Sequence, residues 1–246
     1  MDIAPSSDID RGASRLRLSG VVCAYNEAER IAGVLDVLAA HPAVDEVIVV
    51  DDGSQDATAA MVVACPGVRL ISYPQNRGKA YALAQGVAAA RGAYLLLVDA
   101  DLTGIDAGHI DALVAPVLAG EADAALSLRA NTLWLYSLIG LDFVSGERVL
   151  PAWLLREALD EMRGLRPWGA EAYMNDLIIR ERLRIAVVDW PEVSHTPKAR
   201  KVGALKGAVE DLKMIRDAVS TLTPLGVVRQ NVSLLRLKTP GGRPVA

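Results

Sequence analysis

Short apolar runs and longer amphipathic segments alternate along the first hundred residues. An apolar run at 18–24 is followed by a segment with one apolar stripe at the i, i+3, i+4, i+7 spacing of a buried helix face. The members of that stripe are Ile31, Val34, Leu35 and Leu38. Asn26, with Glu29 three residues later, has the pattern of a capping box, which predicts that the helix begins at Asn26.

The same alternation continues to residue 98. The run at 46–50 is mostly β-branched, which is typical of a strand covered on both faces in a parallel sheet. The next predicted elements are a helix at 56–64, a strand at 68–72, a helix at 78–90 and a strand at 94–98. Four strands alternating with three helices indicate an α/β fold, with a Rossmann-like, mostly parallel sheet flanked by helices. Ligands of such sheets bind at the carboxyl ends of the strands.

The second half of the chain is richer in helical patterns. Its predicted elements are strands at 123–128 and 184–189 and helices at 151–162, 171–182 and 204–220. After Asp217 the chain has basic residues but no acidic one. We therefore expect a helical C-terminal extension with a basic tail.

Composition narrows the class of protein. With 52% hydrophobic residues the chain has ample material for a core. Its 26 Lys and Arg residues against 30 Asp and Glu give a net charge of -4, so charge does not indicate a nucleic-acid binder. Two cysteines without CxxC spacing predict buried thiols in a reducing compartment. The polar, acidic first residues predict no signal peptide, and no apolar stretch reaches the ~20 residues of a membrane span, so we expect a cytoplasmic protein.

Acidic and amide side chains directly follow three of the predicted strands, at Asn26-Glu27, Asp51-Asp52 and Asp99-Ala100-Asp101. In an extended segment Asp99 and Asp101 lie on one face, roughly 6.5–7 Å apart, where their like charges repel. Either one carboxyl stays protonated or a cation holds both, and carboxylate oxygens favour Mg²⁺ or Mn²⁺, which typically bind a phosphate as well. A solvated strand end with one capping aspartate is the alternative. An EF-hand loop is excluded because Ile110 stands where a glutamate is needed.

Four blocks in this order resemble family 2 glycosyltransferases of the GT-A fold: "VVCAYNEAERI", "VIVVDDGSQDAT", "NRGKAYALAQG" and "LLLVDADL". Later segments, including "SGERVL" and "SHTPKARKVG", are similar to polyprenyl-phosphate (dolichyl-phosphate type) sugar synthases. The resemblance spans residues 18 to about 206. It implies a GT-A domain at 16–206. The polar first residues predict a disordered lead-in at 1–15, and the pattern after the domain predicts a C-terminal helix and basic tail at 207–246.

The resemblance also implies an inverting transfer of a hexose from a UDP- or GDP-sugar, with Mg²⁺ or Mn²⁺ bridging the diphosphate to the protein. The metal ligands expected from it are Asp99, Asp101 and His195. The donor-binding residues expected from it are Tyr25, Glu27, Asp51, Asp52, Asn76, Arg77, Lys79, Asp99 and Lys201. A helix-start loop at Asn76 and an ordinary loop histidine at 195 remain the alternatives.

Two kinds of acceptor stay open. A hydroxyl acceptor needs a general base, for which Glu171 and Asp176 are the candidates. A polyprenyl phosphate or other lipid-linked acceptor needs no base, and Arg129 and Arg148 are the candidates to bind its phosphate. The first hypothesis is the lipid acceptor, and the alternative is a hydroxyl of a soluble metabolite or glycan, with Glu171 as base. A third hypothesis is a nucleotide-sugar binding protein without transfer.

The segment 131–144 departs from the synthase pattern, since it is short and rich in large apolar residues. It predicts either a core helix or a patch that faces a lipid. A basic loop that contains Lys201 would close over the diphosphate or lie on anionic lipid. Peripheral association with the inner face of a membrane and a homo-oligomer are both compatible with this sequence.

Overall fold

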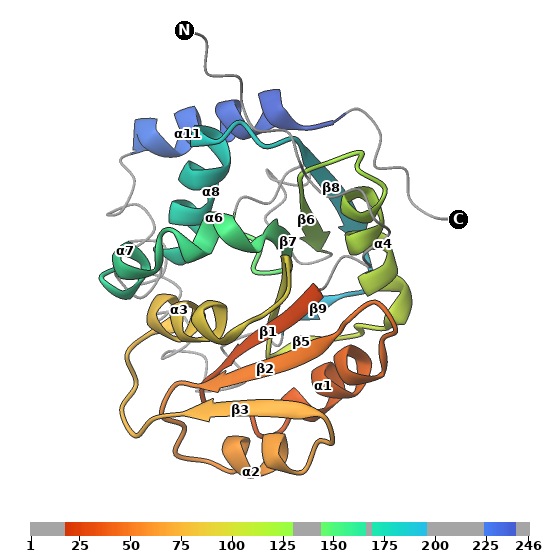
Figure 1. Cartoon of the computed structure of the whole chain (residues 1–246), viewed down its shortest axis with the longest axis vertical. Helices are drawn as coiled ribbons and strands as arrows, with labels where there is room; N and C mark the ends of the chain where they lie inside the picture. Colours follow the sequence, from red (N-terminus) through yellow and green to blue (C-terminus); the bar gives the residue numbers. More distant parts are fainter. Residues whose placement is uncertain (1–17, 130–143, 166–168, 196–223, 240–246) are drawn as a thin grey trace, which may run out of the picture.

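The computed structural model describes residues 18–129, 144–165, 169–195 and 224–239. Seven strands form one sheet in the order β3-β2-β1-β4-β7-β6-β8 (Figure 1). Their bounds are β1 Leu18–Ala24, β2 Glu46–Asp51, β3 Val68–Ser72, β4 Tyr94–Asp99, β6 Ala124–Arg129, β7 Arg148–Pro151 and β8 Ile185–Trp190. Only β7 runs against its neighbours β4 and β6 within this sheet, so the sheet is mostly parallel.

Eight helices are described, and a two-stranded sheet joins β5 (Leu102–Thr103) to β9 (Ser194–His195). The helices are α1 Ile31–Ala40, α2 Thr58–Val63, α3 Lys79–Ala89, α4 Ala107–Leu118, α6 Ala152–Arg156, α7 Leu159–Arg163, α8 Ala170–Arg180 and α11 Pro224–Leu237. None of the helices among the described residues is long and apolar enough to span a bilayer.

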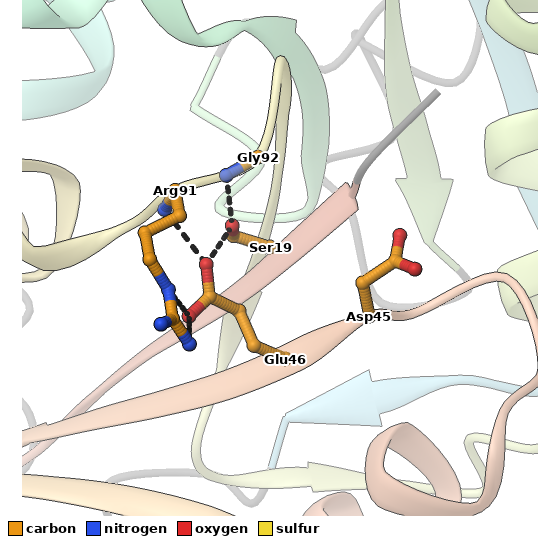
Figure 2. A pocket seen from close by; sticks show the side chains of 5 residues that line it. All are labelled: Ser19, Asp45, Glu46, Arg91 and Gly92. Carbon is orange, nitrogen blue, oxygen red and sulfur yellow. Dashed lines mark hydrogen bonds and ion pairs between the residues drawn. The ribbon is translucent and has the colours of Figure 1, made fainter. Parts of the chain in front are cut away.

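The amino ends of β1 and β2 are closed by a polar cluster around a pocket of about 280 Å³ (Figure 2). The Glu46 carboxylate accepts hydrogen bonds from the Ser19 hydroxyl at 2.7 Å and from the Arg91 backbone amide at 2.7 Å. Ser19 in turn accepts from the Gly92 amide at 2.8 Å. These bonds tie the start of β4 to β1 and β2, so this edge of the sheet serves stability.

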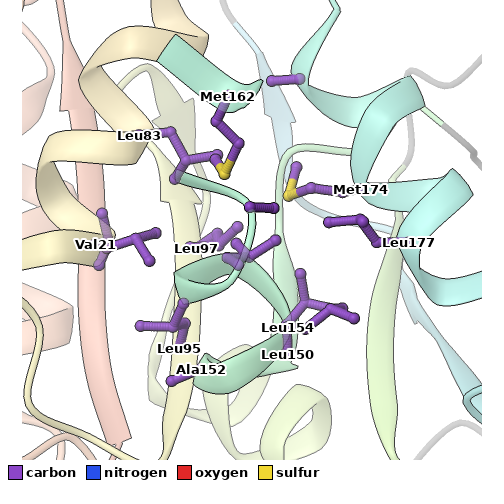
Figure 3. Packing of buried hydrophobic residues seen from close by; sticks show 14 of the residues in the cluster. Val21, Leu83, Leu95, Leu97, Leu150, Ala152, Leu154, Met162, Met174 and Leu177 are labelled. Carbon is purple, nitrogen blue, oxygen red and sulfur yellow. The ribbon is translucent and has the colours of Figure 1, made fainter. Parts of the chain in front are cut away.

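Successive residues of the central strands point to opposite faces of the sheet, and each face has its own apolar core. Leu95 and Leu97 of β4 pack with Leu83 of α3 and with α6, α7 and α8 on one face (Figure 3). Leu96 and Val98 pack against α1 and α4 on the other face. Because both faces are covered, the central strands are continuous apolar runs, as the sequence predicted.

The predicted elements of the first hundred residues are confirmed to within two residues, except at the start of α1. That helix begins at Ile31, and Asn26 is not its N-cap. Asn26 adopts a left-handed backbone conformation with φ of 56°, and its side chain accepts from the Gln55 amide at 2.8 Å. The predicted helix at 151–162 is two short helices, α6 and α7. The strand β7 and the helix α4 were not predicted. The helix α11 lies within the predicted helical C-terminal extension at 207–246, and the helix predicted at 204–220 lies outside the described residues.

Candidate functional site

The carboxyl ends of β1, β2 and β4 lie side by side. In the register of the sheet Ala24 is opposite Asp51, and Cys23 is opposite Asp99. The loops that follow these strands therefore meet at one edge, where the sequence analysis placed its polar clusters. This edge is opposite to the pocket of Figure 2, which lies at the amino ends of the same strands.

A lysine bridges two carboxylates at this edge. Nζ of Lys79, the first residue of α3, lies 2.6 Å from Oδ1 of Asp99 at the end of β4. The same Nζ lies 2.8 Å from Oε1 of Glu171 in the first turn of α8. We call these three residues the Lys79 cluster. It brings together a residue predicted to bind the donor, a residue predicted to bind the metal, and a residue predicted to act on the acceptor.

The cluster has a defined charge state. Burial disfavours the ammonium form of Lys79, but the carboxylates of Asp99 and Glu171 outweigh burial and raise the pKa of Lys79 well above its usual range. Lys79 therefore stays protonated at neutral pH. Cys23 lines the same small cavity as the Lys79 cluster. Burial raises the pKa of its thiol to about 12, and the charge of Lys79 opposes this effect only in part. Cys23 is consequently a neutral thiol in the floor of the site.

Gly146 packs directly on the carboxylate of Asp99. A Cβ built on Gly146 would collide with both carboxylate oxygens, so no larger residue fits here without a shift of Asp99 or of the chain. Gly146, Cys23 and the Lys79 cluster line one small cavity. The glycine of "SGERVL" therefore has a specific role at this site that the sequence analysis missed, because a single glycine carries no signal of what approaches it.

The sheet pairing also brings the backbone of His195 next to the segment Asp99-Ala100-Asp101. His195 of β9 pairs with Leu102 of β5, the residue directly after Asp101. The side chain of Thr103 reaches β9 as well, with Oγ1 donating to the Ser194 carbonyl at 3.0 Å. The side chain of His195 lies outside what the structure describes. The pairing places the backbone of His195 beside Leu102, and a role of His195 as a metal ligand stays a prediction.

A metal ion fits this edge by the chemistry of its donors. Carboxylate oxygens are ligands that Mg²⁺ and Mn²⁺ prefer, and the Asp99 carboxylate already accepts one cation, the ammonium of Lys79. Among the described residues no group of three or more His, Cys, Asp and Glu side chains stands ready to hold a metal. Asp99, Asp101 and His195 are the residues that would hold the ion, with His195 contributing a side chain outside the described set.

The acidic pair after β2 is buried and shapes the loops around it. The carboxylate of Asp52 accepts from the backbone amides of Arg77 and Gly78, both at 2.8 Å, and from the Tyr73 hydroxyl at 2.7 Å. Asp51 accepts from the Ser54 amide at 3.1 Å. Both residues were predicted to contact the nucleotide. Asp52 fixes the loop that precedes α3, and a contact of Asp52 with a nucleotide stays a prediction.

The other predicted donor residues lie around the same edge. Tyr25 is 43% exposed, and Glu27 forms an ion pair with Arg30 at 2.7 Å. Asn76 is exposed, and the guanidinium of Arg77 stacks 3.6 Å above the Tyr81 ring. Lys201 lies outside the described residues.

The four residues predicted to act on the acceptor have different surroundings in the structure. Glu171 is in the Lys79 cluster, whereas Asp176 is at the other side of α8 and accepts from Nε2 of Gln230 on α11 at 2.7 Å. Arg129 forms an ion pair with the buried Glu147 at 3.3 Å. Arg148 is completely buried in the protein interior. Its position does not support the expectation that it binds an acceptor phosphate, because its side chain is enclosed by protein on all sides.

Comparisons with known proteins match the first half of the chain to glycosyltransferases. Residues 19–134 match the family model "Glycosyl transferase family 2". The succinoglycan biosynthesis protein ExoO of Rhizobium meliloti is 45% identical over 86 residues, which are 34% of this chain and 25% of that protein. A dolichyl-phosphate beta-glucosyltransferase of Dictyostelium discoideum is 39% identical over 99 residues, 34% of this chain and 30% of that protein. This chain thus matches between a quarter and a third of the length of these relatives.

Solved structures extend the likeness to the second half of the chain. The glucosyl-3-phosphoglycerate synthase of Mycobacterium tuberculosis, crystallised with Mn²⁺, UDP-glucose and phosphoglyceric acid, superposes with a TM-score of 0.63. It is 26% identical, and the superposition covers 83% of this chain and 79% of that one. The mostly parallel sheet flanked by helices is therefore the GT-A fold, as the sequence analysis expected.

Proposed function

Because the chain carries a family 2 glycosyl transferase domain on a GT-A fold, we propose that it is a metal-dependent glycosyltransferase with a hydroxyl acceptor. It moves a hexose, with inversion, from a nucleoside diphosphate sugar to a small acceptor molecule. UDP-glucose is the donor with the best support, since it is bound in the M. tuberculosis neighbour.

One observation carries the choice of acceptor. The carboxylate of Glu171 is 2.8 Å from Lys79 Nζ, which also touches Asp99 at the predicted metal position. This contact supports Glu171 as the general base that a hydroxyl acceptor requires, because its carboxylate would lie close to a diphosphate bound at Asp99. The base takes the hydroxyl proton while the acceptor oxygen attacks the anomeric carbon, and the nucleoside diphosphate leaves from the opposite side.

Lys79 has two roles in this proposal. In the free protein it neutralises Asp99 and Glu171, whose charges would otherwise repel each other. When a diphosphate binds, the ammonium turns towards its oxygens and offsets the charge that builds up on the leaving group. That movement leaves the Glu171 carboxylate available to accept a proton.

A metal ion held at this edge would contribute charge at the same place. Asp101, Asp99 and His195 would hold Mg²⁺ or Mn²⁺, which supplies Lewis-acid stabilisation of the diphosphate. Tyr25 and Asp51 at the ends of β1 and β2 would border the nucleobase and ribose. Arg77 would lie beside the diphosphate, and Lys201 belongs to the loop that would close over it.

A polyprenyl phosphate acceptor is the second candidate. It is favoured by the 36–42% identity to dolichyl-phosphate glucosyltransferases, although these matches cover about a third of this chain. The likeness to the phosphoglycerate enzyme covers 83% and so includes the acceptor half. The burial of Arg148 also argues against a phosphate site at that residue. Association with a membrane surface belongs to this second candidate.

The test is a transfer assay with UDP-glucose and GDP-mannose, each with Mn²⁺ or with EDTA. The acceptors are 3-phosphoglycerate, glycerol 3-phosphate and dolichyl phosphate, and both nucleotide release and the glycosylated product are measured. The Glu171→Gln variant is compared with Glu181→Gln, a surface acid at the end of the same helix.

We expect metal-dependent transfer to a hydroxyl acceptor, reduced roughly 10²–10⁴-fold in Glu171→Gln and unchanged in Glu181→Gln. Transfer to dolichyl phosphate that does not depend on Glu171 would replace the proposal by the second candidate. Metal-dependent nucleotide binding without any product would support the third hypothesis, a binding protein.

A further inference from the structure

A buried polar network lies behind the Lys79 cluster. Nη1 of Arg148 on β7 donates to Oδ1 of Asn175 on α8 at 2.7 Å. Nδ2 of Asn175 donates to Oε1 of Gln230 on α11 at 3.2 Å. Arg148 and Asn175 are fully buried, and Gln230 is 3% exposed. The network therefore connects the sheet to two helices, α8 and α11.

At one end of the network, Arg148 binds the turn at 145–147, which contacts Asp99. Nε of Arg148 donates to the Ser145 carbonyl at 2.7 Å. The next residue is Gly146, which packs against the Asp99 carboxylate so closely that a Cβ has no room. The guanidinium thus fixes the carbonyl of the residue that precedes this close contact, and with it the distance between the turn and Asp99.

At the other end, Gln230 binds the first turn of α8, which carries Glu171. Nε2 of Gln230 donates to the Ala172 carbonyl at 3.0 Å, and Ala172 follows Glu171 directly. The same amide donates to Asp176 at 2.7 Å. Asn175 lies one helical turn after Glu171. Both carboxylates that share Lys79 are therefore supported from behind by the Arg148, Asn175 and Gln230 side chains.

We propose that Arg148, with Asn175 and Gln230, is a positioning residue that sets the separation of Asp99 and Glu171. This inference rests on the proposed function of these two carboxylates in metal binding and proton transfer. It makes α11, at the C-terminal end of the chain, a structural part of the site although it contributes no group to the reaction.

The chemistry of the network supports a positioning role. Burying a charge costs several kcal/mol in desolvation unless its hydrogen bonds are satisfied. Apolar residues of similar volume often stabilise a core as well as a buried charged group does, so stability alone does not explain a buried arginine. Arginine offers a planar fork of donors, which can hold a carbonyl and a side-chain amide in fixed directions. Holding the turn at 145–147 and the helix α8 in one relative position is a function that an apolar side chain cannot perform.

The experiment compares Arg148→Met and Arg148→Lys with a matched control, Arg156→Met. Arg156 is a partly buried arginine that donates to the carbonyls of Ala90 and Gly92 at the opposite edge of the sheet. The first readout is the Mn²⁺ concentration needed for half-maximal UDP binding, measured by calorimetry. The second is the labelling rate of Cys23 with a thiol reagent in a Cys65→Ser background, since Cys23 lines the cavity beside Gly146.

We expect Arg148→Met to raise the Mn²⁺ requirement about 10–100-fold and to accelerate Cys23 labelling, because the turn loses its support. Arg148→Lys recovers part of both effects, since its ammonium can still donate to the Ser145 carbonyl. Arg156→Met lowers the melting temperature without changing either readout.

The two readouts separate the failure of this inference from the failure of the proposed function. Wild-type Mn²⁺ dependence and labelling in a folded Arg148→Met variant would overturn the positioning role. If the parent protein binds no nucleotide with Mn²⁺, the proposed function falls, and faster Cys23 labelling in Arg148→Met alone would still establish that Arg148 holds the turn. Equal acceleration in Arg156→Met would show a general loosening of the fold and also overturn the inference.

Discussion

Replacing Gly146 by alanine tests how closely the turn at 145–147 packs on Asp99. A methyl group at this position would overlap the Asp99 carboxylate. The obstacle is a short side chain at the end of a buried strand, so it cannot swing away as the tip of a lysine would. Either Asp99 or the turn must move, and Lys79, which is 2.6 Å from Asp99, must follow.

The size of the effect follows from the overlap. A shift on the order of 1 Å is needed to relieve it, and a misplacement of that size at a reacting centre costs roughly 10²-fold in rate. Overpacking a buried position also destabilises a protein by about 1–3 kcal/mol. For a chain of this length each kcal/mol lowers the melting temperature by about 2–4 °C.

Turnover of UDP-glucose and the melting temperature are measured for Gly146→Ala beside a matched control, Gly33→Ala. Gly33 lies in α1, and a Cβ there meets nothing within 4 Å. The control should retain full turnover and gain about 0.5–1 kcal/mol, since alanine favours the helix over glycine. Full turnover of Gly146→Ala at the parental Mn²⁺ concentration would show that the position of Asp99 against the turn does not matter, and would refute this reasoning.

Three further predictions concern charge. Lys79→Met should bind Mn²⁺ more tightly than the parent in the absence of nucleotide, because no ammonium competes for Asp99. It should transfer the sugar at least about 10-fold more slowly, because the diphosphate loses a cation. Parental values in both calorimetry and turnover would contradict this prediction. Burial would raise the pKa of Glu46, but hydrogen bonds from Ser19 and Arg91 outweigh it and hold that pKa below its usual value. The stability that Glu46 contributes is thus present above its unfolded pKa of about 4.3 and is lost as pH falls through the folded pKa. Urea titrations should therefore show a steeper loss of unfolding free energy below about pH 5 for the parent than for Glu46→Gln. Parallel curves would argue against this. Because burial raises the pKa of Cys23 to about 12, Cys23 should resist thiol reagents in the folded protein even at pH 9 and react after unfolding; fast labelling of the native protein would contradict its neutral state.

The first half of the fold was predictable because its signals are local. Each strand of the parallel region is a continuous apolar run, and each following helix carries one apolar stripe, so short windows of sequence suffice. The strand β7 was missed because it has four residues, of which Arg148 is charged although fully buried. Its place in the sheet depends on pairing with β4 and β6, which no local pattern encodes.

The candidate site was predictable in part for the same reason. Asp99 and Asp101 could be singled out because they stand two residues apart at the end of an apolar run. The strand β4 ends at Asp99 and Asp101 lies in the following turn, so the extended geometry expected for the pair is not what the structure has. The contact of Lys79 with Glu171 joins α3 to α8, and the sequence offered only the residue types. The hydrogen bonds of Asp52 to the loop before α3 could not be predicted, because a carboxylate that follows a strand can bind backbone amides as well as a ligand. Such partners are decided by the fold, after the local elements have formed.

The most direct test of the account is calorimetric titration of UDP-glucose into the protein and into Asp101→Asn, each with Mn²⁺ and with EDTA. The account predicts binding by the parent protein in Mn²⁺, a loss of at least about 10-fold in affinity in EDTA, and little difference between the two conditions for Asp101→Asn. Equal affinity in Mn²⁺ and EDTA for the parent protein, or unchanged Mn²⁺-dependent binding by Asp101→Asn, would contradict the claim that this edge of the sheet holds a nucleotide sugar through a metal ion.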